Sequence, residues 1–169
     1  MTDPFRPLDP AEADPPLSET LRAVALPGGG LPEAVARMAH SPVTLQTFLA
    51  ANARLQESVL PPYDREVVIL TVAVRNGCEV CITMHSNAFR RLGADDHQLR
   101  QAIGGAGVDS RIGALRSFTL AMIDRTGAVT DDERDAFLRA GYSPRAALEV
   151  ALIIGTYTIS TFANRLTRA

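Results

Sequence analysis

The chain has 169 residues, the size of one ordinary domain, and 46 % of them are hydrophobic, which is enough for a core. Its formal net charge of −2 offers no basic surface of the kind that binds nucleic acid. All seventeen basic residues are arginine, which excludes a catalytic or phosphate-binding lysine. We therefore expect one globular domain that does not act on nucleic acid.

The first 32 residues differ in composition from the rest. They hold seven of the eleven prolines and predict an extended arm with one short helix near Ser18–Ala25, ahead of a single domain over residues 33–169. The segment is acidic and proline-rich, where a signal peptide would be basic and then apolar. The longest apolar tract, Ala151–Ala163, is short for a bilayer span and is broken by hydroxyl groups. We expect a cytoplasmic protein without membrane contact.

Helical patterns begin after the arm. A short helix is expected over Pro32–Met38, and the next has Ser41 as its N-cap and Pro42 at its first position. Its apolar face is predicted to comprise Val43, Leu45, Phe48, Leu49 and Leu55.

The following segment, YDREVVILTVAVRNG, is ambiguous. Its β-branched run would fit a buried strand of eight residues. A helix is favoured because Asp64 is a candidate N-cap, because Arg65 and Glu66 suit a first turn and because Asn76–Gly77 is a typical helix end.

The second half of the sequence also predicts helices. One runs from about Cys78 to Leu92 and stops at Gly93, and the next begins at Asp95. A third has Asp109 as its cap and Gly127 at its end.

The last two predicted helices have clear N-terminal signals. Thr130 caps a short helix, and Ser143 with Pro144 opens the final one. From Leu148 to Phe162 that helix is apolar nearly all round, which predicts a central position or a subunit contact. No alternating strand pair is visible, so the fold class is all-α, a compact helical array with a helix–turn–helix at its centre.

The central helix–turn–helix carries both cysteines of the chain, within NGCEVCITMH. On one helix, Cys78, Cys81 and His85 fall within about 60° of each other. A cysteine in a first helical turn meets free N–H groups and the positive end of the helix dipole, which lower its pKa and favour the thiolate. Such a pair suits a reversible disulfide, in which one sulfur becomes a sulfenic acid and the other expels water from it.

Two further residues complete a candidate proton relay. His85 is placed to accept a proton from Cys81, and a carboxylate would orient its imidazole. Glu66 is the best candidate for that carboxylate. If the helices fold back through the Asn76–Gly77 turn, His85 is carried toward Glu66.

The ordered set Glu66, Cys78, Cys81 and His85, with spacing E-x11-C-x2-C-x3-H, resembles the alkylhydroperoxidase D-like members of the carboxymuconolactone decarboxylase superfamily. The resemblance extends over roughly residues 40 to 166. It implies an all-α fold that assembles as trimers or hexamers. It also implies a thiol peroxidase in which Cys81 is attacked by peroxide, Cys78 resolves the product, and Glu66 and His85 relay protons.

The resemblance further implies no bound cofactor and an external dithiol as reductant, such as a lipoylated partner. The sequence departs from the best-known peroxidases at Val80, where they carry a histidine. Alternatives are a CxxC disulfide oxidoreductase that does not use peroxide, and a carboxymuconolactone decarboxylase-like enzyme, although the decarboxylase branch lacks the CxxC.

A non-enzymatic alternative is a helical oligomer with a Cys/His metal site. Cys78, Cys81 and His85 are three potential zinc ligands, with Glu66 as a fourth, but a structural zinc site usually has a second ligand pair. The remaining histidines, His40 and His97, are expected to be ordinary. Asn164 is a buried-polar candidate without an assigned role, and Tyr157 and Phe162 are expected in the core or an interface.

Overall fold

The computed structural model describes residues 3–104 and 111–169, and within these ranges the chain is helical and contains no strand. The α-helices are α1 (Pro15–Ala23), α2 (Glu33–Met38), α3 (Pro42–Arg54), α4 (Pro62–Arg75), α5 (Glu79–Arg91), α6 (Asp96–Gly104), α7 (Arg111–Asp124), α8 (Asp131–Arg139) and α9 (Pro144–Thr167), with 3₁₀ turns η1 (Pro10–Glu12) and η2 (Leu55–Glu57). The all-α prediction is confirmed.

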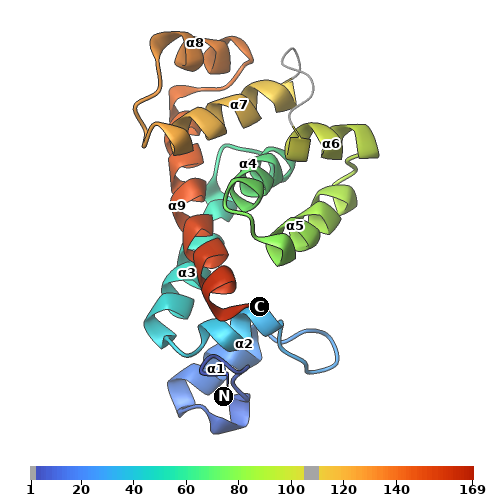
Figure 1. Cartoon of the computed structure of the whole chain (residues 1–169), viewed down its shortest axis with the longest axis vertical. Helices are drawn as coiled ribbons and strands as arrows, with labels where there is room; N and C mark the ends of the chain where they lie inside the picture. The colour runs from blue at the N-terminus through green and yellow to red at the C-terminus, as the bar shows by residue number, and fades with distance from the viewer. Residues whose placement is uncertain (1–2, 105–110) are drawn as a thin grey trace.

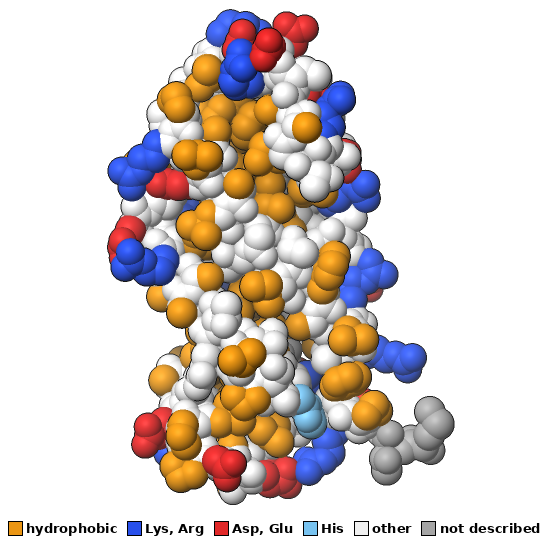
Figure 2. All heavy atoms as spheres, turned by 90° about the vertical axis from the view of Figure 1, so that its left-hand side faces the viewer, with side chains coloured by type: hydrophobic (Ala, Val, Ile, Leu, Met, Phe, Trp, Pro, Cys, Tyr) orange, Lys and Arg blue, Asp and Glu red, His pale blue; other side chains and the backbone are white. Residues whose placement is uncertain are grey.

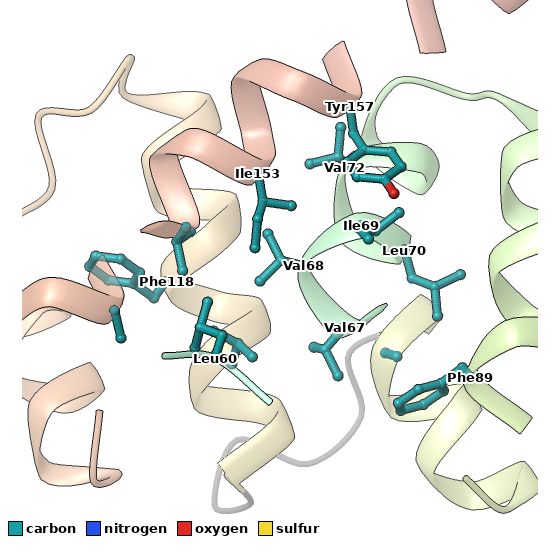
Figure 3. Packing of buried hydrophobic residues seen from close by; sticks show 14 of the residues in the cluster. Leu60, Val67, Val68, Ile69, Leu70, Val72, Phe89, Phe118, Ile153 and Tyr157 are labelled. Atoms are coloured by element: carbon teal, nitrogen blue, oxygen red, sulfur yellow. The ribbon is translucent and has the colours of Figure 1, made fainter. Parts of the chain in front are cut away.

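Helix α4 lies at the centre of the main core. It packs against α5, α7 and α9, and its residues are buried from Val67 to Ala73 (Figure 1). Ile153 and Tyr157 of α9 lie beside Val68 and Val72 of α4 (Figure 3). Burial on every side explains why the β-branched run reads as continuously apolar although it is helical.

Local N-terminal signals set three helix starts as predicted. The side chains of Ser41 and Ser143 accept hydrogen bonds from the backbone N–H groups of Thr44 and Ala146. Thr130 forms a complete capping box with Glu133. Asp109, the predicted cap of the following helix, lies outside the described residues.

The prediction that Asp64 caps α4 is wrong. The helix begins three residues earlier, with Pro61 at the N-cap and Pro62 at the first position, because proline lacks an N–H that would need a partner there and has a φ suited to a helix start. Asp64 is instead buried, and its carboxylate accepts a hydrogen bond of 2.6 Å from Arg111. The guanidinium of Arg111 lies 4.2 Å from the ring centroid of Tyr142.

The N-terminal segment folds onto the same chain. Helix α1 begins at Pro15 rather than near Ser18. A second core joins α1, α2 and α3 through Leu17, Leu21, Met38, Ala39 and Leu45. The division of the chain at residue 32 into an arm and a domain stays a prediction.

Two expected apolar faces are only partly buried. Leu45 of α3 is fully buried, but Val43 is 73 % exposed, so that face is narrower than predicted. Helix α9 exposes four large apolar side chains, Leu148, Leu152, Phe162 and Leu166. Figure 2, in which the left-hand side of Figure 1 faces the viewer, shows hydrophobic side chains along much of this surface. Phe162 is thus not a core residue.

By length and composition alone, α9 would suffice to cross a membrane, unlike the shorter tract recognised in the sequence. The core helix of a soluble protein meets the same criteria. Helix α9 packs against α2, α3, α4 and α7, and 33 % of its apolar stretch is buried.

Candidate active site

The two cysteines lie where the turn after α4 leads into α5. Cys78 is the N-cap residue, with φ −93° and ψ 92°, and Cys81 is the third residue of the helix. The prediction that Cys78 lies within the first turn is therefore wrong by one position. Only Cys81 and His85 share a strip of the helix, as an i, i+4 pair. Cys81 is the cysteine within the first turn of α5.

Cys78 and Cys81 form a disulfide, with their Cα atoms 5.3 Å apart. Only 1 % of Cys78 and 3 % of Cys81 are exposed. Ala73 is buried with them, and Val80 and Ile82 pack against the cluster. The pair therefore lies in an apolar setting that excludes bulk water.

The turn before the disulfide is anchored to α9. Gly77 has a φ of +64°, which favours glycine, and the N–H of Cys78 donates to the carbonyl of Ala73 at 2.9 Å. The side-chain amide of Asn76 donates to Thr161 Oγ1 at 2.9 Å, and Arg165 donates to the carbonyl oxygen of Asn76. Helix α9 thereby fixes the position from which α5 starts.

Glu66 and His85 are brought together as expected. Glu66 Oε2 lies 2.8 Å from Nδ1 of His85, and the two side chains are 15 % and 13 % exposed. If the Nδ1 proton points at the carboxylate, Nε2 is the nitrogen that exchanges a proton with a substrate or a thiol. The pair has the geometry of an oriented base.

The ring of Tyr157 packs against the imidazole of His85. The two rings meet edge to face, with centroids 5.1 Å apart, and the Tyr157 hydroxyl donates to Asn52 Oδ1 at 2.9 Å. Burial, and then the negative charge of Glu66, raise the pKa of Tyr157, while Arg65 acts in the opposite direction. Tyr157 therefore stays protonated and contributes shape rather than charge.

In the described part of the chain, no hydrogen bond joins the imidazole of His85 to either sulfur of the disulfide, which carries no proton to transfer. Proton transfer from the reduced Cys81 to His85 therefore stays a prediction. His85 and Cys81 lie one turn apart on α5, as an i, i+4 pair.

The residue that does contact a sulfur is Asn164 of α9. Its Nδ2 donates to Cys81 Sγ at 3.3 Å, the residue is 4 % exposed, and its Oδ1 is buried without a hydrogen-bond partner among the residues that the structure describes. The sequence marked Asn164 only as a buried polar residue. Its position beside Cys81 depends on how α9 packs against the start of α5, which no local sequence pattern predicts.

A pocket of about 200 Å³ opens beside the disulfide. Its lining residues come from the start of α5 and the end of α9: Gly77, Cys78, Glu79, Val80, Asn164, Arg165, Arg168 and Ala169. Cys78 borders it and Cys81 does not, so a molecule in the pocket meets Cys78 first.

The other histidines lie elsewhere. His40 Nε2 is 2.8 Å from the carbonyl oxygen of Arg6, and His97 borders a separate cavity of about 520 Å³ between α4, α6 and α7. Over residues 3–104 and 111–169, no three His, Cys, Asp or Glu side chains are grouped as a metal site requires. This arrangement gives the zinc alternative no geometric support.

Comparison with known proteins gives a consistent assignment. The model of the carboxymuconolactone decarboxylase family matches residues 42–124, a range that includes Glu66, both cysteines and His85. No curated protein matches the sequence.

Several solved structures share the fold over almost the whole chain. A peroxidase-related protein from a Silicibacter species is 22 % identical, with a TM-score of 0.77, over 99 % of this chain and 93 % of its own. A protein from Ralstonia eutropha described as an alkylhydroperoxidase AhpD core is 20 % identical, with a TM-score of 0.80, over 98 % and 91 %.

A third similar structure has a different described activity. The debrominase Bmp8 is 19 % identical, with a TM-score of 0.75, over 100 % of this chain and 92 % of its own. A cysteine-to-alanine variant of it was solved with 2,3,4-tribromopyrrole. At these identities, the likenesses establish the fold.

Proposed function

Because residues 42–124 match the carboxymuconolactone decarboxylase family model and the fold is that of alkylhydroperoxidase D-like structures, we propose that the chain is an alkylhydroperoxidase D-like member of that superfamily, which reduces hydroperoxides through a reversible Cys78–Cys81 disulfide. The observation that carries the proposal is the disulfide at the start of α5 with the Glu66–His85 pair on the neighbouring turns. A dithiol with a nearby oriented base suits two-electron reduction, because the base takes up and returns the protons that the reaction moves.

The oxidative half-reaction begins with the reduced dithiol. The Cys81 thiolate attacks the terminal oxygen of the hydroperoxide, the O–O bond breaks, and the alkoxide takes a proton and leaves as an alcohol. Cys81 is then a sulfenic acid. The Cys78 sulfur attacks it, forming the disulfide and releasing water. His85, held by Glu66, supplies and accepts the protons.

The reductive half-reaction uses an external dithiol. One donor thiolate attacks Cys78, the sulfur that borders the pocket, and Cys81 leaves as a thiolate. The second donor thiol then attacks the mixed disulfide, so that Cys78 is released and the donor leaves as a disulfide. A lipoyl group is a donor of suitable chemistry, because its two thiols close into a ring.

Single-cysteine variants test the assignment. In Cys78→Ser, one equivalent of hydroperoxide is expected to leave a sulfenic acid on Cys81 that dimedone traps, with no catalytic turnover. In Cys81→Ser, trapping is expected to fall at least tenfold. Trapping on Cys78 alone would reverse the two roles, and equal inertness of both variants toward hydroperoxide would refute the peroxidase proposal.

The second candidate is a dithiol oxidoreductase that does not use peroxide. The full-length likeness to a debrominase favours an aryl bromide as the substrate to test. There, the dithiol would supply two electrons, the carbon–bromine bond would be replaced by carbon–hydrogen, and bromide and the disulfide would form. Release of bromide from tribromopyrrole with no peroxide turnover would favour this alternative.

We also propose that the protein is a soluble cytoplasmic homo-oligomer, a trimer or a hexamer. The support is the row of exposed apolar side chains on α9, Leu148, Leu152, Phe162 and Leu166, since an apolar surface of this kind marks an interaction site. Burial of these side chains between subunits would remove them from water.

A further inference from the structure

Asn164 is the only side chain outside the CxxC segment with a described hydrogen bond to a sulfur. It comes from α9, 83 residues along the chain from Cys81. Its backbone is held at the end of the helix, where its carbonyl oxygen accepts from the N–H of Ala169 at 3.0 Å. The side chain is therefore presented to Cys81 from a fixed helix end.

The orientation of the amide is set by chemistry. A disulfide sulfur has no proton and accepts hydrogen bonds only, so the NH₂ group of Asn164 faces Cys81 rather than its oxygen. The sulfur becomes a much better acceptor when the disulfide opens and Cys81 carries a negative charge. The same contact is thus stronger in the thiolate state than in the structure described.

The other end of the amide has no structural purpose in the described residues. Oδ1 of Asn164 is buried and accepts no hydrogen bond. A buried acceptor without a partner lowers stability, and such groups are rare enough in folded proteins to require a functional reason. A leucine of similar size would fill the space without that cost.

We infer that Asn164 is a catalytic residue whose side-chain N–H stabilises the Cys81 thiolate. This inference rests on the proposed dithiol chemistry of Cys78 and Cys81. The stabilisation acts twice in the cycle, because Cys81 is the nucleophile toward the hydroperoxide and the leaving group when a donor thiolate attacks Cys78. Asn164 also lines the pocket beside Cys78 and is thus in place when the donor sulfur arrives.

The role differs from that of the histidine pair. Glu66 and His85 hydrogen-bond each other and do not hydrogen-bond a sulfur in the described structure, whereas Asn164 contacts Cys81 directly. Asparagine does not titrate in water, so it stabilises the thiolate without accepting its proton. The side chain of Val80, next to Cys81 in the sequence, has no hydrogen-bond donor, whereas that of Asn164 donates to the Cys81 sulfur.

The test measures the pKa of Cys81 alone, in the Cys78→Ser background, from the pH dependence of its alkylation by iodoacetamide. A hydrogen bond to a charged group corresponds to a rise of about one to two pH units when it is lost. Asn164→Leu is expected to raise the midpoint by that amount, while its melting temperature stays equal to the parent's or increases. Asn164→Asp, which places an anion beside the sulfur, is expected to raise it further.

Ser160→Ala is the matched control. Ser160 is buried on α9 one turn before Asn164, and its substitution is expected to leave the midpoint unchanged. Midpoints within about 0.2 pH units of the parent in both folded Asn164 variants would overturn the inference. If Asn164→Leu does not fold, the near-isosteric Asn164→Asp decides the question.

The test is independent of peroxide. A raised midpoint in a protein that turns over no hydroperoxide would support Asn164 and refute the peroxidase proposal. An unchanged midpoint in a protein that turns over hydroperoxide would refute the role of Asn164 and leave the peroxidase proposal supported.

Discussion

His85 and Glu66 lie 19 residues apart in the sequence, on antiparallel helices, and are joined by a hydrogen bond of 2.8 Å between Nδ1 and Oε2. The Asn76–Gly77 turn folds α5 back along α4, so His85, the seventh residue after Cys78, comes level with Glu66, the fifth residue of α4. The carboxylate fixes the imidazole, which leaves Nε2 available for proton transfer.

Removal of this pair is expected to slow peroxide reduction in a graded way. His85→Gln removes the base and is expected to lower kcat/KM by about 100-fold or more. Glu66→Gln leaves the imidazole but releases its orientation, and a smaller loss is expected. Steady-state peroxide consumption measures both, with Glu57→Gln, an exposed carboxylate on η2, as control. Full activity in His85→Gln would contradict the relay.

Val80 lies between the two cysteines, packed against the buried cluster that they form with Ala73. An imidazole at this position would stand beside both sulfurs and provide a second proton carrier. Val80→His is therefore expected to raise peroxide turnover by roughly 10-fold or more. Val80→Ala separates loss of packing from the added base. A histidine variant no faster than the alanine variant would show that the relay lacks nothing at position 80.

Glu149 of α9 holds Ser58 and Val59, which follow η2, through hydrogen bonds. Its carboxylate accepts hydrogen bonds from Ser58 Oγ at 2.6 Å, the N–H of Val59 at 2.7 Å and Arg145 at 2.8 Å. Burial acts to raise the pKa of Glu149, but these hydrogen bonds outweigh it, so the pKa is lowered from its ordinary value of 4.5. The charged form is thus the one that the fold favours.

A lowered pKa gives stability that is complete above about pH 4.5 and is lost as the pH falls through the folded-state value. Glu149→Gln is expected to lower the free energy of unfolding by about 1–3 kcal/mol at pH 7. The difference from the parent should shrink below pH 4 when unfolding by urea is followed by circular dichroism. A deficit that is the same at pH 7 and at pH 3.5 would contradict the charge-based account.

The apolar row on α9 gives a prediction about assembly. Phe162 is 60 % exposed and Leu166 is 68 % exposed, one turn further along. Burial of such a side chain stabilises an interface by about 1.5–3 kcal/mol per copy, so Phe162→Glu is expected to shift a trimer or hexamer toward monomers. Light scattering after size exclusion measures the mass, and Leu26→Glu tests an exposed leucine elsewhere. An unchanged mass would exclude this face as the interface.

Local signals predicted the helices well and their exact starts less well. Ser41, Thr130 and Ser143 cap helices as expected, because an N-cap bond spans only three residues. Asp64 was wrongly predicted as the N-cap of α4. The helix begins at Pro62, and the carboxylate of Asp64 pairs with Arg111 instead of capping the helix. That ion pair joins residues 47 positions apart, and no local pattern records it.

Part of the candidate site could likewise be predicted from the sequence, and part depends on tertiary packing. The approach of His85 to Glu66 was expected on the condition that the two helices fold back through the Asn76–Gly77 turn, and the two side chains do form a hydrogen bond. Asn164 was found only as a polar residue in an apolar helix, because its partner Cys81 is set by the packing of α9 at the start of α5. The shielding of both sulfurs likewise depends on tertiary packing.

In the proposed function, Cys78 and Cys81 alternate between dithiol and disulfide, and a hydroperoxide is reduced each time the disulfide forms. The most direct measurement is the intact mass of fully reduced, chelator-treated protein before and after one equivalent of hydroperoxide. The protein is expected to lose two mass units, the mass of two hydrogen atoms, and a dithiol is expected to restore them. An unchanged mass in folded protein would contradict the proposed function.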